Sequence, residues 1–239
     1  MGNILSIEKL QVGYKQALMP ELNFEAKTND FIAILGRNGI GKSTFLHTIV
    51  GLQKKLSGEI FYNGKNINEI KLSEKSKIIS YVPSQVSFLL NFSVYDLLAM
   101  GRSPYTNVFN KISENDKEII EKEIVKFNID HIRNKNLDEI SDGEKQRAMI
   151  ARCFVQQTKL IVMDEPTSFL DYYNKQKLFL DLLKSTKEEN KTIILSTHDL
   201  ALATKYCDKI WILGSNPKEY TIEELKENKI LEEELSFSF

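Results

Sequence analysis

A glycine-rich segment between a short apolar run and a helical pattern constrains this chain more than any other feature. Residues 36–44 read GRNGIGKST and fit the pattern G-x-x-x-x-G-K-[ST]. The apolar residues 31–35 before it predict a buried strand, and residues 45–50 after it predict a helix that ends near Gly51. Strand, glycine loop and helix in this order bind phosphate, because backbone N–H groups and the positive helix end face the anion.

The phosphate loop, our name for residues 36–44, offers ligands for a nucleotide and a metal ion. Lys42 is placed to reach the β- and γ-phosphates, and the Ser43 hydroxyl is placed to bind Mg²⁺. The other nucleotide-binding candidates share this loop and are Gly36, Arg37, Asn38, Gly39, Gly41 and Thr44. The pattern predicts a nucleoside triphosphate and Mg²⁺ as cofactors.

Composition excludes several classes of protein. The 239 residues include 32 basic and 33 acidic side chains, so the net charge of −1 gives no footprint for nucleic acid or an anionic membrane. Purely apolar runs span about five residues, far fewer than the roughly 20 that cross a bilayer. The first residues lack the basic region of a signal peptide. We therefore expect one intracellular domain whose Cys153 and Cys207 are reduced, buried thiols.

Hydrophobic periodicity divides the chain into three parts. Short strands are predicted first, at residues 4–7, 22–26, 31–35, 59–62 and 78–82. Between about 86 and 150 the strand pattern gives way to three helices, which start at Ser93, Ser113 and near Ser141. Strands and helices then alternate, with strands at 160–163, 192–196 and 210–213 and helices at 172–187 and 199–207. This alternation predicts a mostly parallel sheet, and the charged tail from Gly214 predicts one exposed helix.

Two carboxylates follow the apolar strand at residues 160–163. Asp164 is placed to bind Mg²⁺ and Glu165 to orient a water for attack on the γ-phosphate. The alternative, a surface acidic pair ending a strand, is disfavoured by the phosphate loop. His198 follows another strand and would reach the same sheet edge, where it can bond a phosphate oxygen. The residues alone leave open whether Gln85 touches Mg²⁺ or the attacking water.

These segments occur in the order found in ABC-transporter ATPases. Besides the phosphate loop, Gln85, Asp164-Glu165 and His198, they include residues 140–147 (ISDGEKQR) and 168–171 (SFLD). The chain resembles that family over about residues 3 to 213, and the pattern [LI]-S-x-G-x-x-Q-R belongs to it alone among P-loop enzymes. The resemblance implies an α/β fold, with a RecA-like P-loop core, an N-terminal antiparallel β-subdomain and an inserted helical subdomain. On this basis residues 1–239 form one ABC ATPase domain, with the helical subdomain at about 86–157 and a tail at 214–239.

The resemblance also implies an ATPase with ATP and Mg²⁺ as cofactors, and it assigns roles to residues. Glu165, His198 and Gln85 would be catalytic, Ser43, Gln85 and Asp164 would hold Mg²⁺, and Tyr14 would stack on adenine. Two subunits would sandwich two ATP molecules head to tail. Ser141 and the Gly143 N–H would then cap the partner's γ-phosphate, at a helix N-terminus suited to an anion, while Asp171 would couple the two sites.

The segment at residues 140–147 departs from the family pattern at two positions. Asp142-Gly143 stands where the family usually has two glycines, and Glu144 stands in place of the usual Gln. A carboxylate close to a triphosphate is repulsive unless it points away or caps the helix.

Residues 92–105 (FSVYDLLAMGRSPY) resemble a run in the ATPases of iron-siderophore, haem and cobalamin importers. In that subfamily the region, with Gln85, receives a helix of the membrane permease. The resemblance thus implies a homodimer that binds a permease through residues about 85–105, at the cytoplasmic face of the cell membrane, and works indirectly with a substrate-binding protein. The alternative for this run is an amphipathic helix followed by a turn at Ser103-Pro104.

Two other kinds of ABC protein are alternatives to an importer ATPase. A soluble ATPase of the iron–sulfur cluster assembly type also has one cassette of similar length, so length does not discriminate, although the run at 92–105 argues against it. ABC proteins of DNA repair or the ribosome need a coiled-coil insertion, zinc-binding cysteines or tandem cassettes. The sequence shows none of these features and is not basic, so we expect no nucleic-acid partner.

Overall fold

Two β-sheets and a group of helices make up the computed structural model, which describes residues 2–85, 92–106 and 111–227. The smaller sheet is antiparallel, in the order β2 (Leu22–Lys27), β1 (Asn3–Gln11), β4 (Ser57–Tyr62) and β5 (Lys65–Asn66). The larger sheet has the order β10 (Lys218–Thr221), β9 (Lys209–Ile212), β3 (Phe31–Leu35), β8 (Thr192–Ser196), β7 (Leu160–Met163) and β6 (Ile79–Val82). Its neighbouring strands pair in parallel except β10, which is antiparallel to β9. The predicted α/β fold is confirmed.

The larger sheet is covered on both faces, as buried parallel strands require. Every residue of β3, β7 and β8 is buried. Side chains alternate along β3, so that Ile32 and Ile34 join the core formed with the smaller sheet and α1 (Lys42–Ile49). Phe31 and Ala33 join a second core with the remaining helices. Between the two sheets Phe24 stacks on Trp211, with ring centroids 4.7 Å apart.

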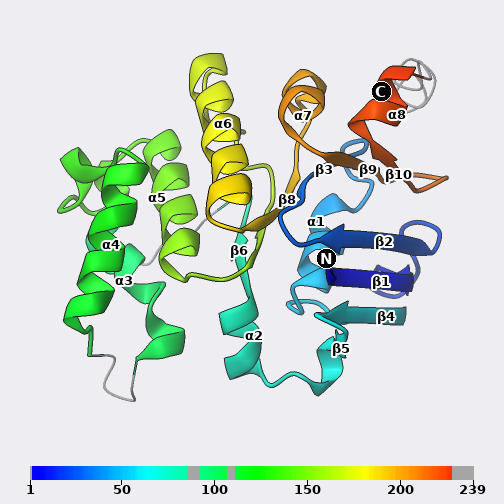
Figure 1. Ribbon diagram of the computed structural model, residues 1–239, viewed down its shortest axis with the longest axis horizontal. Helices are drawn as coiled ribbons and strands as arrows, with labels where there is room; N and C mark the ends of the chain where they lie inside the picture. Colours follow the sequence, from blue (N-terminus) through cyan, green and yellow to red (C-terminus); the bar gives the residue numbers. More distant parts are fainter. Residues whose placement is uncertain (1, 86–91, 107–110, 228–239) are drawn as a thin grey trace.

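Three helices form the inserted helical part, drawn in green at the left of Figure 1. They are α3 (Val94–Met100), α4 (Glu114–Lys126) and α5 (Asp142–Val155). Each begins at a serine with a capping box, Ser93, Ser113 or Ser141, as the sequence predicted. No strand interrupts them within residues 92–106 and 111–155.

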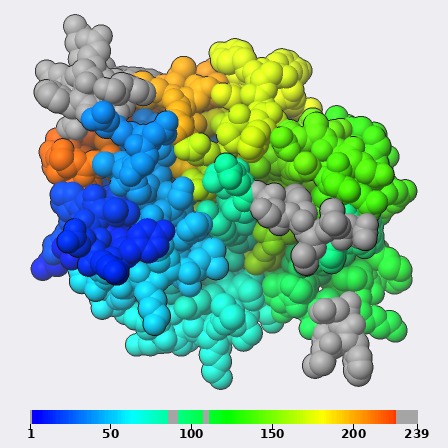
Figure 2. All heavy atoms as spheres, turned by 180° about the vertical axis from the view of Figure 1, so that it is seen from behind, coloured from blue at the N-terminus to red at the C-terminus, as the bar shows by residue number. Residues whose placement is uncertain are grey.

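Helices α6 (Tyr172–Glu188) and α7 (Leu200–Tyr206) follow β7 and β8. They cover the face of the larger sheet opposite the smaller sheet, and lie at the top of Figure 1. Figure 2, seen from behind, shows the blue and cyan N-terminal segments on one side and the green helical part on the other.

Three predicted elements need correction. Ile78 ends a helix, α2 (Leu72–Ile78), so the following strand begins one residue later than predicted. Helix α1 begins at Lys42 rather than at residue 45. The tail is not a single exposed helix, because β10 pairs with β9 before α8 (Ile222–Glu227), and Leu225 is buried. The Glu219 carboxylate on β10 accepts the Trp211 Nε1–H at 2.8 Å, which ties the tail to the core.

The end of the predicted tail, residues 228–239, lies outside the described residues, as do 86–91 at the start of the predicted helical subdomain. Cys153 and Cys207 are free and buried, as predicted. Within the described chain, no helix combines the length and apolar character that a membrane span requires.

Candidate active site

The phosphate loop connects β3 to α1, in the strand–loop–helix order that the sequence predicted. Gly39 and Gly41 have φ angles of +78° and +108°, a backbone region that favours glycine. A Cβ at Gly41 would lie 2.9 Å from Met19 Cε, so Met19 packs against the start of α1. Tyr14, the residue predicted to stack on adenine, is 74% exposed.

Lys42 joins the phosphate loop to the ends of two other strands. Its ammonium donates to Gly36 O at 3.0 Å and lies 3.3 Å from His198 Nε2 and 3.8 Å from Glu165 Oε1. The side chain is buried, and this desolvation lowers the pKa of Lys42, although the carboxylates of Glu165 and Asp164 oppose the shift. The loop therefore holds a positive charge against the two predicted catalytic side chains.

Ser196, the last residue of β8, positions both carboxylates. Its hydroxyl donates to Asp164 Oδ1 at 2.6 Å and accepts the Glu165 backbone N–H at 2.8 Å. Glu165 itself has a φ of +46°, which is uncommon outside glycine and turns the chain sharply at the end of β7. Sequence analysis did not select Ser196. The available signal was a small polar residue that closes an otherwise apolar strand and is fully buried.

Glu165 and His198, the two residues predicted to be catalytic, lie in contact at this edge of the sheet. His198 Nε2 lies 2.7 Å from Glu165 Oε1, and the two side chains are 40% and 31% exposed. They line a cavity of about 310 Å³ with Thr167, Ser168 and Lys175. A half-exposed carboxylate beside a phosphate loop can accept a proton from an attacking water.

Ser43, Asp164 and Gln85, the residues predicted to hold Mg²⁺, offer oxygen ligands that suit this ion. Asp164 is 1% exposed, and such a buried carboxylate requires a partner that the Ser196 hydroxyl supplies to one oxygen. The Ser43 hydroxyl is exposed at the second residue of α1, and Gln85 is exposed three residues after the end of β6. Hydroxyl, carboxylate and amide oxygens are the hard ligands that Mg²⁺ prefers.

The remaining residues of the phosphate loop differ in their exposure to solvent. Arg37, Asn38 and Gly39 are exposed at the tip, whereas the Thr44 side chain is buried in α1. The loop thus presents its tip to solvent and fixes its end in the core.

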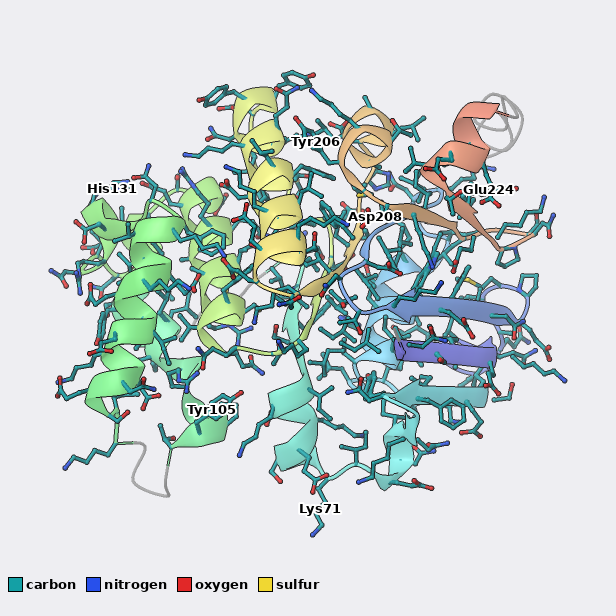
Figure 3. The ribbon with its side chains drawn as sticks, in the orientation of Figure 1. Lys71, Tyr105, His131, Tyr206, Asp208 and Glu224 are labelled. Atoms are coloured by element: carbon teal, nitrogen blue, oxygen red, sulfur yellow. The ribbon has the colours of Figure 1, made fainter. Side chains whose placement is uncertain are left out.

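The predicted capping segment, residues 141–147, lies on the helical part and is held by local contacts. The Ser141 hydroxyl donates to Glu144 Oε2 at 2.7 Å, and the Ser141 N–H donates to the same oxygen at 2.9 Å. These bonds lower the pKa of the Glu144 carboxyl, with a further contribution from His131, which is labelled in Figure 3. Glu144 therefore completes a capping box, which accounts for one departure from the family pattern.

Asp142 and Gly143 sit at the exposed start of α5. The Asp142 side chain is 66% exposed and accepts from Lys145 Nζ at 3.0 Å. A Cβ at Gly143 would lie 3.2 Å from the Phe169 carbonyl oxygen, so glycine permits close packing there.

Asp171 caps α6 by accepting the Asn174 N–H at 2.8 Å. Hydrogen bonds from Asn174 lower its pKa, and nearby Arg147 adds to the shift. Across the described residues, no hydrogen bond or ion pair joins residues 141–147 to the phosphate loop, so one chain brings together only part of the predicted site residues.

The fold and site together define a P-loop nucleoside triphosphatase. A phosphate loop follows β3, two carboxylates end β7, and β8 lies between these strands with Ser196 at its end. The sequence pattern of the ABC transporter family matches residues 19–168. The chain belongs to the ABC transporter family, and its activity is ATP hydrolysis.

Similar proteins cover nearly the whole chain. MJ0873 of Methanocaldococcus jannaschii, an ABC transporter ATP-binding protein, is 38% identical over 89% of this chain and 74% of its own length. The petrobactin import ATP-binding protein FpuC of Bacillus anthracis is 30% identical, over 91% and 80%. A solved structure described as a metal-chelate type ABC transporter in an inward-facing conformation matches with a TM-score of 0.85 and 29% identity. It covers 100% of this chain and 89% of its own.

Proposed function

We propose that the chain is the ATP-hydrolysing energy-coupling subunit of an ABC importer. The observation that carries this proposal is the joint placement of Lys42, Glu165 and His198 within one sheet edge, in a chain similar to import ATPases. Glu165 would orient and deprotonate the attacking water, and His198 would hold Glu165 and bond the γ-phosphate. Ser43, Asp164 and Gln85 would hold Mg²⁺, which neutralises charge on the phosphates when bound.

The dimer part of the proposal rests on the exposed start of α5. Ser141 and the Gly143 N–H lie at a helix N-terminus, which favours an anion, and a capping box holds them in place. Because these groups make no bond to the phosphate loop among the described residues, they would cap ATP held by a second copy arranged head to tail. Asp171, which follows the segment that packs on Gly143, would couple the two sites.

The cargo is proposed from relatives and from residues 92–105. The relatives include FpuC, named for petrobactin import, and FhuC of Bacillus subtilis, named for iron(3+)-hydroxamate import, which is 28% identical over 97% of this chain. Others are named for manganese transport (MntB, 31%) and molybdate import (MolC, 32%). We therefore propose metal-containing cargo, with iron-siderophore, haem or cobalamin-type chelates favoured by the run at 92–105. Names that refer to import disfavour the iron–sulfur cluster assembly alternative.

A membrane permease is the proposed partner, together with an indirect substrate-binding protein. The solved relative CbiO1 of Clostridium perfringens, 27% identical, is described as part of the transporter complex CbiONQ. Within the predicted contact region, about 85–105, Phe92, Leu97 and Met100 line a groove beside α3. Residues 86–91 lie outside the described residues. The cassette would thus sit peripherally at the cytoplasmic face of the membrane.

Arg102 of the same run points into the protein. It is 4% exposed, its Nε lies 2.7 Å from Asp116 Oδ1, and its Nη1 donates to Val155 O at 2.9 Å. Arg102 therefore fixes the end of α3 to α4 and α5.

For the division of the chain, we propose one domain with a helical subdomain at about 86–157 and a tail at 214–239.

Purification of the tagged chain from its native cells in mild detergent tests the proposal. We expect a polytopic permease to accompany it, with or without a substrate-binding protein. A soluble assembly scaffold without any membrane protein would overturn the import function and leave ATP hydrolysis intact.

A further inference from the structure

The Tyr14 loop, our name for residues 12–18, closes on itself between β1 and the segment that leads to β2. The Leu18 N–H donates to the Val12 carbonyl oxygen at 2.9 Å. A Cβ at Gly13 would collide with a carbonyl oxygen of the same loop, so the closure requires a glycine there. These features give the loop its shape, whereas its direction depends on contacts with other segments.

The Tyr14 side chain depends on this loop for its position. The ring is largely exposed, and within the described residues its side chain forms no hydrogen bond and no contact with another ring. A base can stack on such a ring only where the loop presents it at the correct distance from the bound phosphates. The contacts that orient the loop therefore decide whether Tyr14 can meet adenine.

The end of the Tyr14 loop rests on the phosphate loop. A Cβ at Gly41 would lie 3.0 Å from Leu18 Cδ1 and 2.9 Å from Met19 Cε. Gly41 is the residue that precedes α1. Leu18 and Met19 therefore fix this end of the Tyr14 loop to the start of that helix.

Gln53 holds the beginning of the Tyr14 loop, and it does so from the other end of α1. Its Nε2 donates to the Gly13 carbonyl oxygen at 2.8 Å, directly before Tyr14 in the chain. Gln53 is itself anchored, because its backbone N–H donates to the carbonyl oxygen of His47, in the last turn of α1, at 3.1 Å. Gly13 is buried, and a buried carbonyl oxygen that loses its donor destabilises the arrangement. The two ends of α1 thus hold the two ends of the Tyr14 loop.

We propose that Gln53 is a positioning residue for the base of the nucleotide. Its amide fixes the direction of the Tyr14 loop relative to α1, so that the ring lies where the adenine of a nucleotide on the phosphate loop arrives. Gln53 thus contributes to the affinity for adenosine and not to the affinity for the phosphates. This role rests on the predicted stacking of Tyr14 on adenine, and it holds whether or not the chain serves an importer.

A comparison of ADP with inorganic pyrophosphate isolates the affinity that comes from adenosine. Both ligands present a diphosphate to the phosphate loop, and neither has a γ-phosphate to be hydrolysed. Isothermal titration calorimetry measures ADP directly and pyrophosphate by its competition with ADP. Gln53→Met removes the amide donor and keeps the length of the side chain. We expect it to weaken ADP binding by about three- to tenfold and to leave pyrophosphate binding within about twofold of wild type.

Gln11→Met is the matched control. Gln11 ends β1 just before the Tyr14 loop, and its Oε1 accepts the Ser57 hydroxyl at 3.1 Å, across the smaller sheet. The same substitution at this position should leave the affinity for both ligands within about twofold of wild type. Equal weakening of ADP binding by Gln11→Met and Gln53→Met would overturn the inference.

A double variant tests whether Gln53 acts through Tyr14. Once Tyr14→Ala has removed the ring, the direction of the loop no longer matters, so adding Gln53→Met should change ADP affinity by less than about twofold. An undiminished effect of Gln53→Met in the Tyr14→Ala background would overturn the inference. So would unchanged ADP binding by Gln53→Met alone, or an equal loss for ADP and pyrophosphate. Wild-type ADP affinity in Tyr14→Ala alone would overturn the predicted role of Tyr14 and this inference with it, and would leave the import function standing.

Discussion

The catalytic edge of the sheet and the start of α5 are organised in opposite ways. At the catalytic edge, Lys42, Asp164 and Ser196 are at most 5% exposed and bond to groups far away in the sequence. Lys42 meets His198 across 156 residues, and Ser196 meets Asp164 across 32. At the start of α5, the hydrogen bonds of Ser141 within the described chain reach only Glu144 and Lys145, three and four residues on, and both Ser141 and Asp142 are exposed.

This difference supports our proposal that one chain supplies only part of each ATP site. Parallel strands end at a common edge, so β3, β7 and β8 bring their terminal side chains together without help from another molecule. A capped helix start satisfies itself locally and leaves backbone donors for an outside anion. We infer that hydrolysis depends on the first region and dimerisation on the second.

Glu165→Gln is the largest test of the catalytic edge. The variant keeps the contact geometry with His198 but cannot accept the proton, so we expect turnover to fall by roughly 10²- to 10⁴-fold. ATP binding should persist, and the closed dimer should accumulate with ATP in size-exclusion chromatography. Unchanged steady-state turnover would remove Glu165 from the catalytic role.

Ser196→Ala tests the buried bridge between the two carboxylate residues. Loss of the hydroxyl leaves Asp164 Oδ1 and the Glu165 N–H without their partner, which should lower the free energy of unfolding by about 1–3 kcal/mol. Urea denaturation measures this change. Ser168→Ala is the control, because its hydroxyl also bonds Glu165, through the carbonyl oxygen, but is exposed. Equal effects of the two substitutions would show that burial of Ser196 is unimportant.

Glu144→Gln tests the local organisation of α5 through pH. Because hydrogen bonds lower the pKa of Glu144 in the folded state, its charge stabilises the fold above the ordinary value of 4.5. That contribution disappears as the pH falls through the lowered folded pKa. We expect the variant to be less stable by about 0.3–1 kcal/mol at pH 7, and the difference from wild type to shrink as the pH falls below 4.5. A difference that is constant with pH in thermal unfolding would contradict this assignment.

Asp142→Gly tests the second departure and should have the smallest effect. The Asp142 carboxylate is exposed and, among the residues that the structure describes, pairs only with Lys145, so its removal should leave hydrolysis intact. Removing a negative charge from the segment that would face the partner's triphosphate should tighten ATP-dependent dimerisation by about two- to fivefold at low salt. Analytical ultracentrifugation with ATP measures the shift. A clear loss of ATPase activity would show that Asp142 has a positive role.

The sequence predicted the helices and strands that carry a clear local signal, either an apolar run or a capping serine. The wholly buried strands β3, β7 and β8 and the three serine-capped helices were found because each has a local signal. Helix α2 was missed because none of its residues is buried, and β10 because four half-buried polar residues form a strand only by pairing with β9.

In the candidate active site, too, the sequence predicts only the residues that have a local signal. The sequence pattern alone predicts the phosphate loop, Asp164 and Glu165 as site residues. Ser196, by contrast, acts through two contacts that exist only because β7 and β8 are neighbours in the sheet. The role of Glu144 likewise required the capping geometry, since the sequence shows only a departure from the usual residue.

The division of labour between the two regions is tested most directly by Ser141→Arg in the Glu165→Gln background. The account predicts that a monomer binds a fluorescent ATP analogue with the affinity of its Glu165→Gln parent, while ATP-driven dimerisation is lost. Lys42→Ala in the same background should lose both. Dimerisation at parental levels in Ser141→Arg, or a fall in monomer affinity as large as that of Lys42→Ala, would contradict the assignment of the α5 start to the partner's nucleotide.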